Sequence, residues 1–219
     1  MNLLRINKDI HPIYWKNNFL CDEEIEKILN YVEKFSPARG QIGGSYEGEG
    51  HLRSGGEKIF PPDFHIKDSG YIPKKRITDV KWIKLNSETN WMYKKIIYQI
   101  HKVNQENFDM ILKFVEDFQF SEYNGSQKSF YSKHRDCEDS SRFENFVDIR
   151  KLSFSIQLTD ENDYDGGELI FYDNNEEIIA PKSKGTIIFF NSNILHEVKP
   201  IKKGIRNALG SWVQGPNLR

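Results

Sequence analysis

The sequence has little cysteine, no long apolar run and almost no net charge. Two cysteines, Cys21 and Cys137, do not make a disulfide framework, and we expect both to be reduced thiols. The 31 lysines and arginines balance 32 acidic residues, so no overall field attracts nucleic acid or a membrane surface. No stretch approaches the roughly 20 apolar residues of a membrane-spanning helix. Residues 1–12 lack the apolar core of a secretory signal. We therefore expect a cytoplasmic protein with neither nucleic acid nor membrane as a partner.

Two amphipathic helices are predicted in the first half of the chain. Behind the acidic run 22–24, apolar residues recur with helical spacing at Ile25, Ile28, Leu29, Val32 and Phe35. A second helix is predicted from the polar cluster 86–89 to about residue 104. Both are expected to support a sheet, with the lead-in 1–20 adding Trp15, Phe19 and Leu20 to the core.

A glycine-rich segment separates these helices. Residues 37–75 hold eight of the 15 glycines and four of the eight prolines, with little periodicity. Loops of this length are uncommon unless they are functional or disordered. A lid that closes over substrate and a plain surface excursion are both open interpretations. We expect His51 and His65, which lie here, to be solvated rather than to bind metal.

The second half reads as β-structure throughout. In "KLSFSIQL", Leu152, Phe154, Ile156 and Leu158 alternate with polar residues, which is typical of a strand with one buried face. A hairpin tip is predicted at 173–175. Short strands separated by turn signals, in a chain rich in aromatic residues, favour a sandwich or jelly roll.

The tripeptide His134-Arg135-Asp136 carries the chemistry. If it lies on a strand, His134 and Asp136 leave the same face, because strand side chains alternate. An imidazole and a carboxylate are two-thirds of the 2-His-1-carboxylate set that suits non-haem iron(II). Alone, such spacing arises by chance in many proteins. A second histidine, His196, follows in an apolar strand, and Arg206 comes ten residues later.

Three segments resemble the iron(II)- and 2-oxoglutarate-dependent dioxygenases, closest to the prolyl-4-hydroxylase-like group. They are "YSKHRD", "RKLSFSIQLTDENDYDGGELIFY" and "GTIIFFNSNILHEVKPIKKGIRNALGSWV". The resemblance covers the C-terminal half closely and the N-terminal half only in its layout. It implies a double-stranded β-helix core over 116–219, supported by helices and loops over 1–115, in one dioxygenase domain 1–219. The expected class is mainly β with supporting helices (α+β).

The resemblance also implies roles for individual residues. His134, Asp136 and His196 are the expected Fe(II) ligands and catalytic residues, and Arg206 is expected to grip the far carboxylate of 2-oxoglutarate through paired hydrogen bonds. Four further residues are expected to border this co-substrate: Gln157, Tyr131, Tyr123 and Trp212. Tyr131 belongs to the Tyr-x-x-His-x-Asp pattern, and the spacing of Tyr123 from His134 is about two residues longer than usual. For Trp212, a place in the hydrophobic core is an equal alternative. Arg76 and Arg150 are interpreted as rim charges.

The implied activity is hydroxylation of a C–H bond, coupled to oxidative decarboxylation of 2-oxoglutarate to succinate, with ascorbate as a further cofactor. A prolyl residue in a peptide or protein is favoured as substrate over a small molecule. Two alternatives stay open. One is a cupin-like metalloprotein that uses the same three ligands without 2-oxoglutarate, against which Arg206 argues. The other is a non-catalytic jelly-roll binding module.

Overall fold

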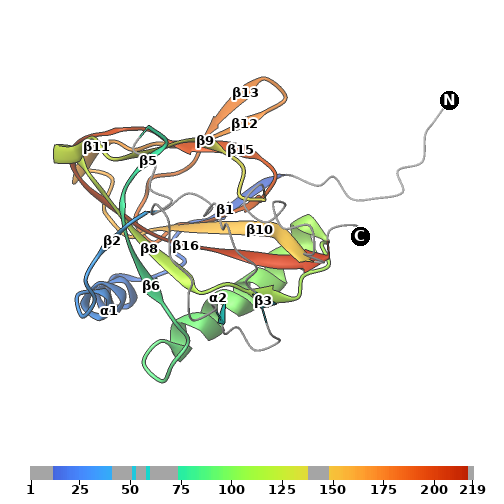
Figure 1. Cartoon of the computed structure of the whole chain (residues 1–219). Coiled ribbons are helices and arrows are strands. Elements are labelled where there is room, and N and C mark those ends of the chain that lie inside the picture. Colours follow the sequence, from blue (N-terminus) through green and yellow to red (C-terminus); the bar gives the residue numbers. More distant parts are fainter. Residues whose placement is uncertain (1–11, 41–50, 53–57, 60–73, 138–147, 217–219) are drawn as a thin grey trace.

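In the described part of the chain, two facing β-sheets form the body of the fold, and two helices lie on the outer side of the larger sheet (Figure 1). This computed structural model describes residues 12–40, 51–52, 58–59, 74–137 and 148–216. The expected class, mainly β with supporting helices, is confirmed. Most of the 37–75 segment, His65 included, lies outside the described residues.

The larger sheet is antiparallel and has nine strands. Its path runs β1 (Ile13–Lys16), β14 (Ile187–Asn191), β10 (Asp148–Gln157), β16 (Ile201–Pro216), β8 (Phe118–Asn124), β6 (Asp79–Ile83) and β2 (Ala38–Arg39). Two short strands, β11 (Tyr164–Gly166) and β7 (Phe114–Val115), also pair with β16. The long strand β16 therefore lies at the middle of the sheet and contacts four partners.

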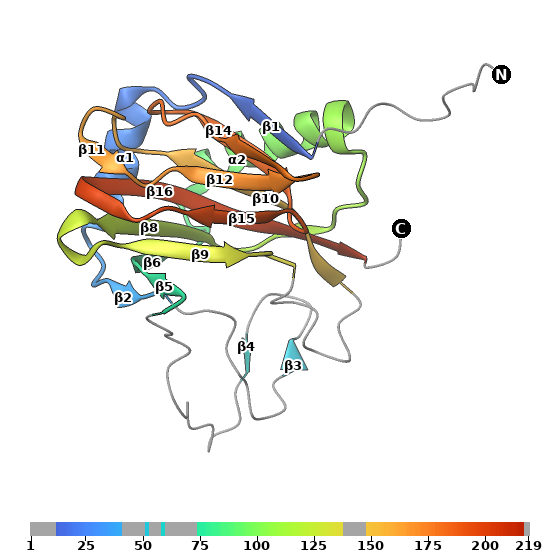
Figure 2. The ribbon, with the colours of Figure 1, turned by 90° about the horizontal axis from the view of Figure 1, so that it is seen from above.

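The smaller sheet has five strands and lies over the larger one (Figure 2). Its order is β13 (Glu176–Ile179), β12 (Leu169–Asp173), β15 (Leu195–Val198), β9 (Phe130–His134) and β5 (Arg76–Ile77). A separate pair joins β3 (His51–Leu52) to β4 (Lys58–Ile59). The hairpin between β12 and β13 turns at Asn174 and Asn175, whose φ values of 46° and 69° confirm the predicted turn chemistry.

The helices α1 (Asp22–Val32) and α2 (Asn90–Val103) each bury one apolar stripe. In α1 the acidic first turn favours the helix dipole, and the backbone N–H of Cys21 donates to Glu24 Oε2 at 3.0 Å. Ile25, Ile28 and Val32 are buried as expected. Phe35 was expected in the same stripe, but the helix ends three residues earlier and the Phe35 side chain is 39% exposed.

A core of aliphatic and aromatic side chains fills the space between the helices and the larger sheet. Leu152, Phe154, Ile156 and Leu158 all join it, so the alternation predicted for β10 is confirmed. Trp15 was expected here and is instead 42% exposed. A second cluster, which includes Tyr123, Phe171 and Phe190, lies between the two sheets. The polar face of β10, with Ser153 and Ser155, is thus left to the space between the sheets.

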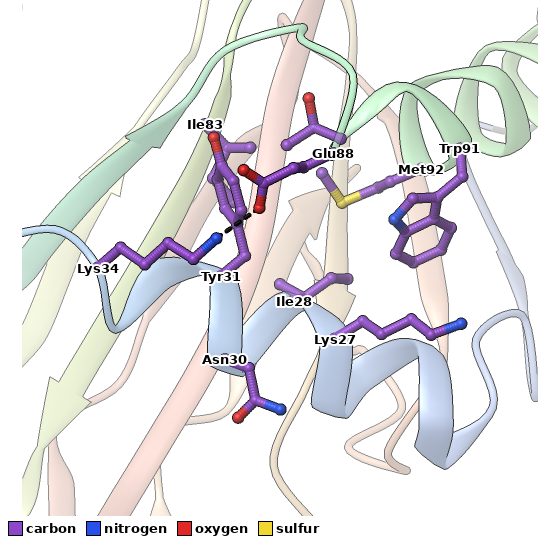
Figure 3. A pocket seen from close by; sticks show the side chains of 10 residues that line it. Lys27, Ile28, Asn30, Tyr31, Lys34, Ile83, Glu88, Trp91 and Met92 are labelled. Atoms are coloured by element: carbon purple, nitrogen blue, oxygen red, sulfur yellow. Dashed lines mark hydrogen bonds and ion pairs between the residues drawn. The ribbon is translucent and has the colours of Figure 1, made fainter.

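A hollow between α1 and α2 lies on the far side of the larger sheet from the smaller one (Figure 3). Ile28, Tyr31, Trp91 and Met92 line it, and an ion pair between Lys34 and Glu88 crosses its edge. Its lining includes no histidine or cysteine. The described residues also include a π-helical turn at Asn104–Phe108 and a 3-10 turn at Gly125–Gln127. Within the described ranges no helix is both long and apolar enough to cross a membrane.

Candidate active site

The two histidines and the aspartate of the predicted triad converge on the inner side of the smaller sheet. His134 ends β9 and lies directly opposite His196 on β15 in the antiparallel register. The potential ligand atoms of His134, Asp136 and His196 all lie within 4.8 Å of one another. Asp136 Oδ1 is 3.5 Å from His134 Nε2, and Asp136 Oδ2 is 3.7 Å from His196 Nε2.

Asp136 does not reach this position in the way the sequence suggested. We expected His134 and Asp136 to share one face of a strand. The strand ends at His134, and Asp136 lies in the turn that follows. The carboxylate is therefore placed by the path of the turn and by its contacts, and strand periodicity does not position it.

Backbone carbonyl groups orient both imidazole rings. His134 Nδ1 lies 2.8 Å from the carbonyl oxygen of Ser132, and His196 Nδ1 lies 3.0 Å from that of Ile194. A carbonyl oxygen only accepts hydrogen bonds, so each Nδ1 carries a proton, and in the neutral ring Nε2 then presents a lone pair. The ring of Tyr131 stacks on His134 at 3.6 Å between centroids. This is the tautomer that metal binding through Nε2 requires.

The charge states of the buried groups also suit a metal. Burial acts to raise the pKa of the Asp136 carboxyl, but interactions with His196 and His134 outweigh burial and lower that pKa well below its usual range. Burial lowers the pKa of His196 to about 4, although the Asp136 charge acts in the opposite direction. At neutral pH the site therefore offers an ionised carboxylate and a neutral imidazole.

A cavity between the sheets opens onto these three residues. Small side chains from three neighbouring strands of the larger sheet form part of its wall: Ser121, Ser155, Ala208 and Gly210. Aromatic rings form another part: Tyr123, Tyr131, Phe190 and Trp212. The small residues leave room for a ligand of modest size beside the triad.

Arg206 lines the same cavity and is buried, with only 2% of its surface exposed. No acidic side chain in the described ranges pairs with it, and its Nε has no hydrogen-bond partner. Its guanidinium carbon lies 5.3 Å from the centre of the Tyr123 ring. A buried cation without a counter-ion is costly, so this arrangement fits an anionic ligand such as a carboxylate.

His196 and Arg206 are only ten residues apart in the sequence, yet they lie on β15 and β16, which belong to the two facing sheets. Both side chains point into the cavity from opposite layers. A carboxylate near Arg206 and a metal near His196 would therefore be held from different sheets.

The remaining predicted residues divide into two groups. Tyr123, Tyr131 and Trp212 line the cavity. Gln157 is buried but does not belong to the cavity wall, and its Nε2 donates to the carbonyl oxygen of Pro181 at 3.4 Å. Trp212 packs against the guanidinium of Arg150 at 3.8 Å.

Two further side chains on the cavity wall were not expected from the sequence. Arg76, interpreted as a rim charge, is only 4% exposed; its guanidinium lies 4.6 Å from the centre of the Tyr131 ring, and Nη2 donates to Gln119 Oε1 at 2.8 Å. Gln119 lines the cavity beside it. No local signal marks either residue, because β5 is only two residues long and Gln119 resembles an ordinary polar strand position.

Arg150 was also interpreted as a rim charge. It forms two hydrogen bonds with the carboxylate of Glu116, both at 2.7 Å, while it stacks on Trp212. This is a fixed, bidentate arrangement. Arg150 therefore helps to hold one wall of the cavity in place.

Comparison with protein families finds one match. Residues 118–214 match the 2OG-Fe(II) oxygenase superfamily. The matched range begins with β8 and ends within β16, so it contains the triad and Arg206.

Curated relatives are similar over short stretches. A PKHD-type hydroxylase of Prochlorococcus marinus (strain MIT 9312) is 48% identical over 63 residues, which is 29% of this chain and 28% of the relative. A PKHD-type hydroxylase of Alteromonas mediterranea is 34% identical over 97 residues, 43% of this chain and 42% of that relative. In both cases the match spans less than half of the relative.

Solved structures are similar over almost the whole chain. A prolyl hydroxylase from Trichoplax adhaerens, in complex with a hypoxia inducible factor oxygen degradation domain peptide fragment, has a TM-score of 0.66 at 18% identity, over 92% of this chain and 83% of that one. A Pseudomonas putida prolyl-4-hydroxylase has a TM-score of 0.60 at 18% identity, over 93% and 92% of the two chains. At this identity the likeness is one of fold, and it agrees with the expected jelly-roll core.

Proposed function

We propose that this protein is an iron(II)- and 2-oxoglutarate-dependent hydroxylase, on the basis of the match of residues 118–214 to the 2OG-Fe(II) oxygenase superfamily. One observation carries the proposal. The buried cluster of His134, Asp136 and His196 shares its cavity with Arg206, a buried cation without an acidic partner in the described ranges.

The donor set fits iron(II). Two imidazole nitrogens and one carboxylate oxygen are the ligands of non-haem iron oxygenases, and three ligands on one side leave positions open for co-substrate and oxygen. His134 and His196 would bind through Nε2, and Asp136 through a carboxylate oxygen. Because His196 is already neutral at pH 7, metal binding there displaces no proton from its ring.

Arg206 fits the distal carboxylate of 2-oxoglutarate. The guanidinium would form charge-assisted hydrogen bonds with it, which removes the cost of an uncompensated buried cation. Tyr123 and Tyr131, both on the cavity wall, are proposed to border the same ligand, with Trp212 closing one side. Gln157 is a weaker candidate for contact with 2-oxoglutarate, because it does not line the cavity.

Bound iron and 2-oxoglutarate supply the chemistry that no side chain can: activation of O2, coupled to loss of CO2 from the co-substrate. The protein's residues bind, orient and exclude water. The carbonyl groups of Ser132 and Ile194 hold the two imidazoles in one tautomer, and aromatic side chains border the space beside the triad. Ascorbate is proposed as a further cofactor, as the resemblance implies.

A prolyl residue in a peptide or protein is the proposed substrate. Its support is the names of the similar proteins and the fold shared with prolyl hydroxylases, one of them bound to a peptide. The exposed aromatic side chain of Trp82 lies 6.3 Å from Trp212, between ring centres, beside the cavity. Such aromatic surfaces suit proline-containing segments.

The proposal also covers the domain organisation and the cellular location of the protein. We propose that residues 1–219 act as one unit and that the protein is cytoplasmic, which the two free cysteines Cys21 and Cys137 support.

The first experiment is an anaerobic titration with Fe(II) and then 2-oxoglutarate, in which the visible metal-to-ligand charge-transfer band is recorded. We expect the band in the wild type, no band in His196→Ala, and a weakened band in Arg206→Ala. Succinate release would then be measured with a proline-containing peptide and with the same peptide carrying alanine in place of proline.

The alternatives predict different results. Iron binding without the band would favour a cupin-like metalloprotein that does not use 2-oxoglutarate. If iron does not bind at all, the enzyme proposal fails and a non-catalytic binding module becomes the better interpretation.

A further inference from the structure

A chain of two buried hydroxyl groups ends on the Asp136 carboxylate. Ser153 Oγ donates to Asp136 Oδ2 at 2.7 Å, and Ser153 Oγ lies 2.8 Å from Ser192 Oγ. Ser153 is 1% exposed and Ser192 is fully buried. None of the roles assigned above involves either serine.

The direction of these hydrogen bonds follows from the number of protons. An ionised carboxylate only accepts, and a serine hydroxyl has one proton to give. Ser153 gives its proton to Asp136, so the bond between the serines must be donated by Ser192. Each donor strengthens the next, and the last bond is assisted by charge.

Ser192 also joins the segments that carry the triad. Its backbone carbonyl accepts from the N–H of Cys137, the residue after Asp136, at 3.1 Å. Its N–H donates to the carbonyl of Lys151 on β10 at 3.0 Å. From Ser192 the chain continues directly into β15 and His196. One residue thus connects β10, the turn of Asp136 and the approach to His196.

Asp136 needs such support because it lies beyond the end of β9, where strand pairing no longer holds the backbone. Ser153 comes from the larger sheet, whereas the triad belongs to the smaller sheet and its turn. The hydroxyl of Ser153 therefore links the two layers at the point where the carboxylate must be held still.

We propose that Ser153, backed by Ser192, is a positioning residue for the metal centre. It engages Asp136 Oδ2 and so leaves Oδ1, which lies 3.5 Å from His134 Nε2, to bind the metal. This inference rests on the proposed function, since it assumes that the triad holds a metal. Residues that orient metal ligands in this way contribute about 10- to 100-fold to metal affinity.

The test is an anaerobic titration of the metal-free protein with Co(II), followed by its visible d–d absorption. In Ser153→Ala we expect Co(II) affinity to fall about 10- to 100-fold and the absorption bands to shift, because the carboxylate can rotate. Ser153→Thr keeps the hydroxyl and should restore both affinity and spectrum. Ser192→Ala should show a smaller loss, since Ser153 can still donate to Asp136.

Thr186→Val is the matched control. Thr186 is fully buried just before β14, at the end of that strand opposite to Ser192, and its hydroxyl donates to Asn17 Oδ1 at 3.3 Å. This variant should lose stability without a change in Co(II) affinity or spectrum.

The outcomes separate the two proposals. If the wild type binds Co(II) and Ser153→Ala binds it equally well with an unchanged spectrum, the positioning role is overturned and the metal centre stands. The positioning role is also overturned if Thr186→Val loses as much affinity as Ser153→Ala. If the wild type itself binds no Co(II), the metal centre fails, and the role of Ser153 fails with it.

Discussion

Arg206 illustrates how a single residue can serve function at the expense of stability. It is a buried cation, and the described residues offer it aromatic rings but no carboxylate. Desolvation of such a charge opposes folding unless a ligand compensates it. The ligand that would do so is the one the site is proposed to bind.

Arg206→Met should therefore have opposite effects on function and stability. The KM for 2-oxoglutarate should rise at least about 30-fold, since losing one partner of a buried hydrogen-bonded charge pair costs about 2 kcal/mol or more. The metal-free protein should unfold at the same temperature or higher, because the buried charge is gone. Steady-state kinetics and thermal unfolding measure the two effects. A clear fall in the unfolding temperature of the metal-free variant would contradict the argument.

Gly167 shows a second constraint at residue scale. Its φ of 66° lies in the left-handed region, and a Cβ there would lie 2.1 Å from Ile201 Cδ1 and 3.2 Å from Arg206 Cδ. Only glycine lets the chain pass this close to the stem of Arg206.

Gly167→Ala should lower stability by about 1 kcal/mol or more and also weaken 2-oxoglutarate binding, because Ile201 and Arg206 must move. Gly185→Ala is the control. Gly185 has a φ of 79°, and a Cβ there would meet the backbone of Leu20 instead of Arg206. The Gly185→Ala control should lose stability but should bind 2-oxoglutarate as tightly as the wild type. Urea unfolding and 2-oxoglutarate titration of both variants test this, and equal binding losses would refute the Arg206 explanation.

At the scale of elements, α1 and α2 are joined by one ion pair. Lys95 Nζ on α2 lies 2.6 Å from both carboxylate oxygens of Glu24 on α1. Burial acts to raise the pKa of Glu24, but the hydrogen bonds from Lys95 and from the backbone N–H of Cys21 outweigh it, so the pKa is lowered. The folded state therefore favours the ionised carboxylate.

The sign of the resulting pH dependence is determined by this lowered pKa. The stabilisation by Glu24 is present above the ordinary glutamate pKa of about 4.3 and is lost as pH falls through the folded value. Glu24→Gln should lower stability at pH 7 and should flatten the loss of stability towards acid pH. Urea unfolding from pH 7 down to about pH 3, which passes below the ordinary glutamate pKa, measures it. Glu26→Gln, on the same helix and without an ion pair in the described ranges, should leave the acid slope as in the wild type.

At the scale of the whole molecule, the site connects segments that are distant along the chain. A metal bound to His134, Asp136 and His196 would tie together β9, the turn that follows it, and β15. A ligand that binds only the folded state stabilises it in proportion to the logarithm of its concentration.

Metal should accordingly raise the unfolding temperature of the protein. At 100 times its Kd, Co(II) would add about 2.7 kcal/mol, which for a chain of this size corresponds to about 5–10 °C. Chelation should reverse the shift. His196→Ala should show no shift at the same Co(II) concentration, and a shift that persists in this variant would mean that the metal binds elsewhere. Differential scanning calorimetry provides the measurement.

Local patterns were enough to predict several features. The stripe of Ile25, Ile28 and Val32 and the alternation of Leu152 with Phe154 follow from the periods of a helix and a strand, and both are present. In these two cases the relevant information lies within a few residues of one segment. The sandwich or jelly-roll expectation came from short strands separated by turn signals, and the resemblance of three segments implied a double-stranded β-helix.

The sequence by itself thus determined the helices, the buried face of β10 and the residue types of the triad, because covalent spacing decides which neighbours share a face. Only the tertiary structure decided that Asp136 leaves the strand, that Arg206 faces His196 from the other sheet, that Arg76 is buried, and that Ser153 holds Asp136. Those features depend on contacts between residues distant along the chain. No local period encodes such contacts, since they arise only when the two sheets pack and exclude water between them.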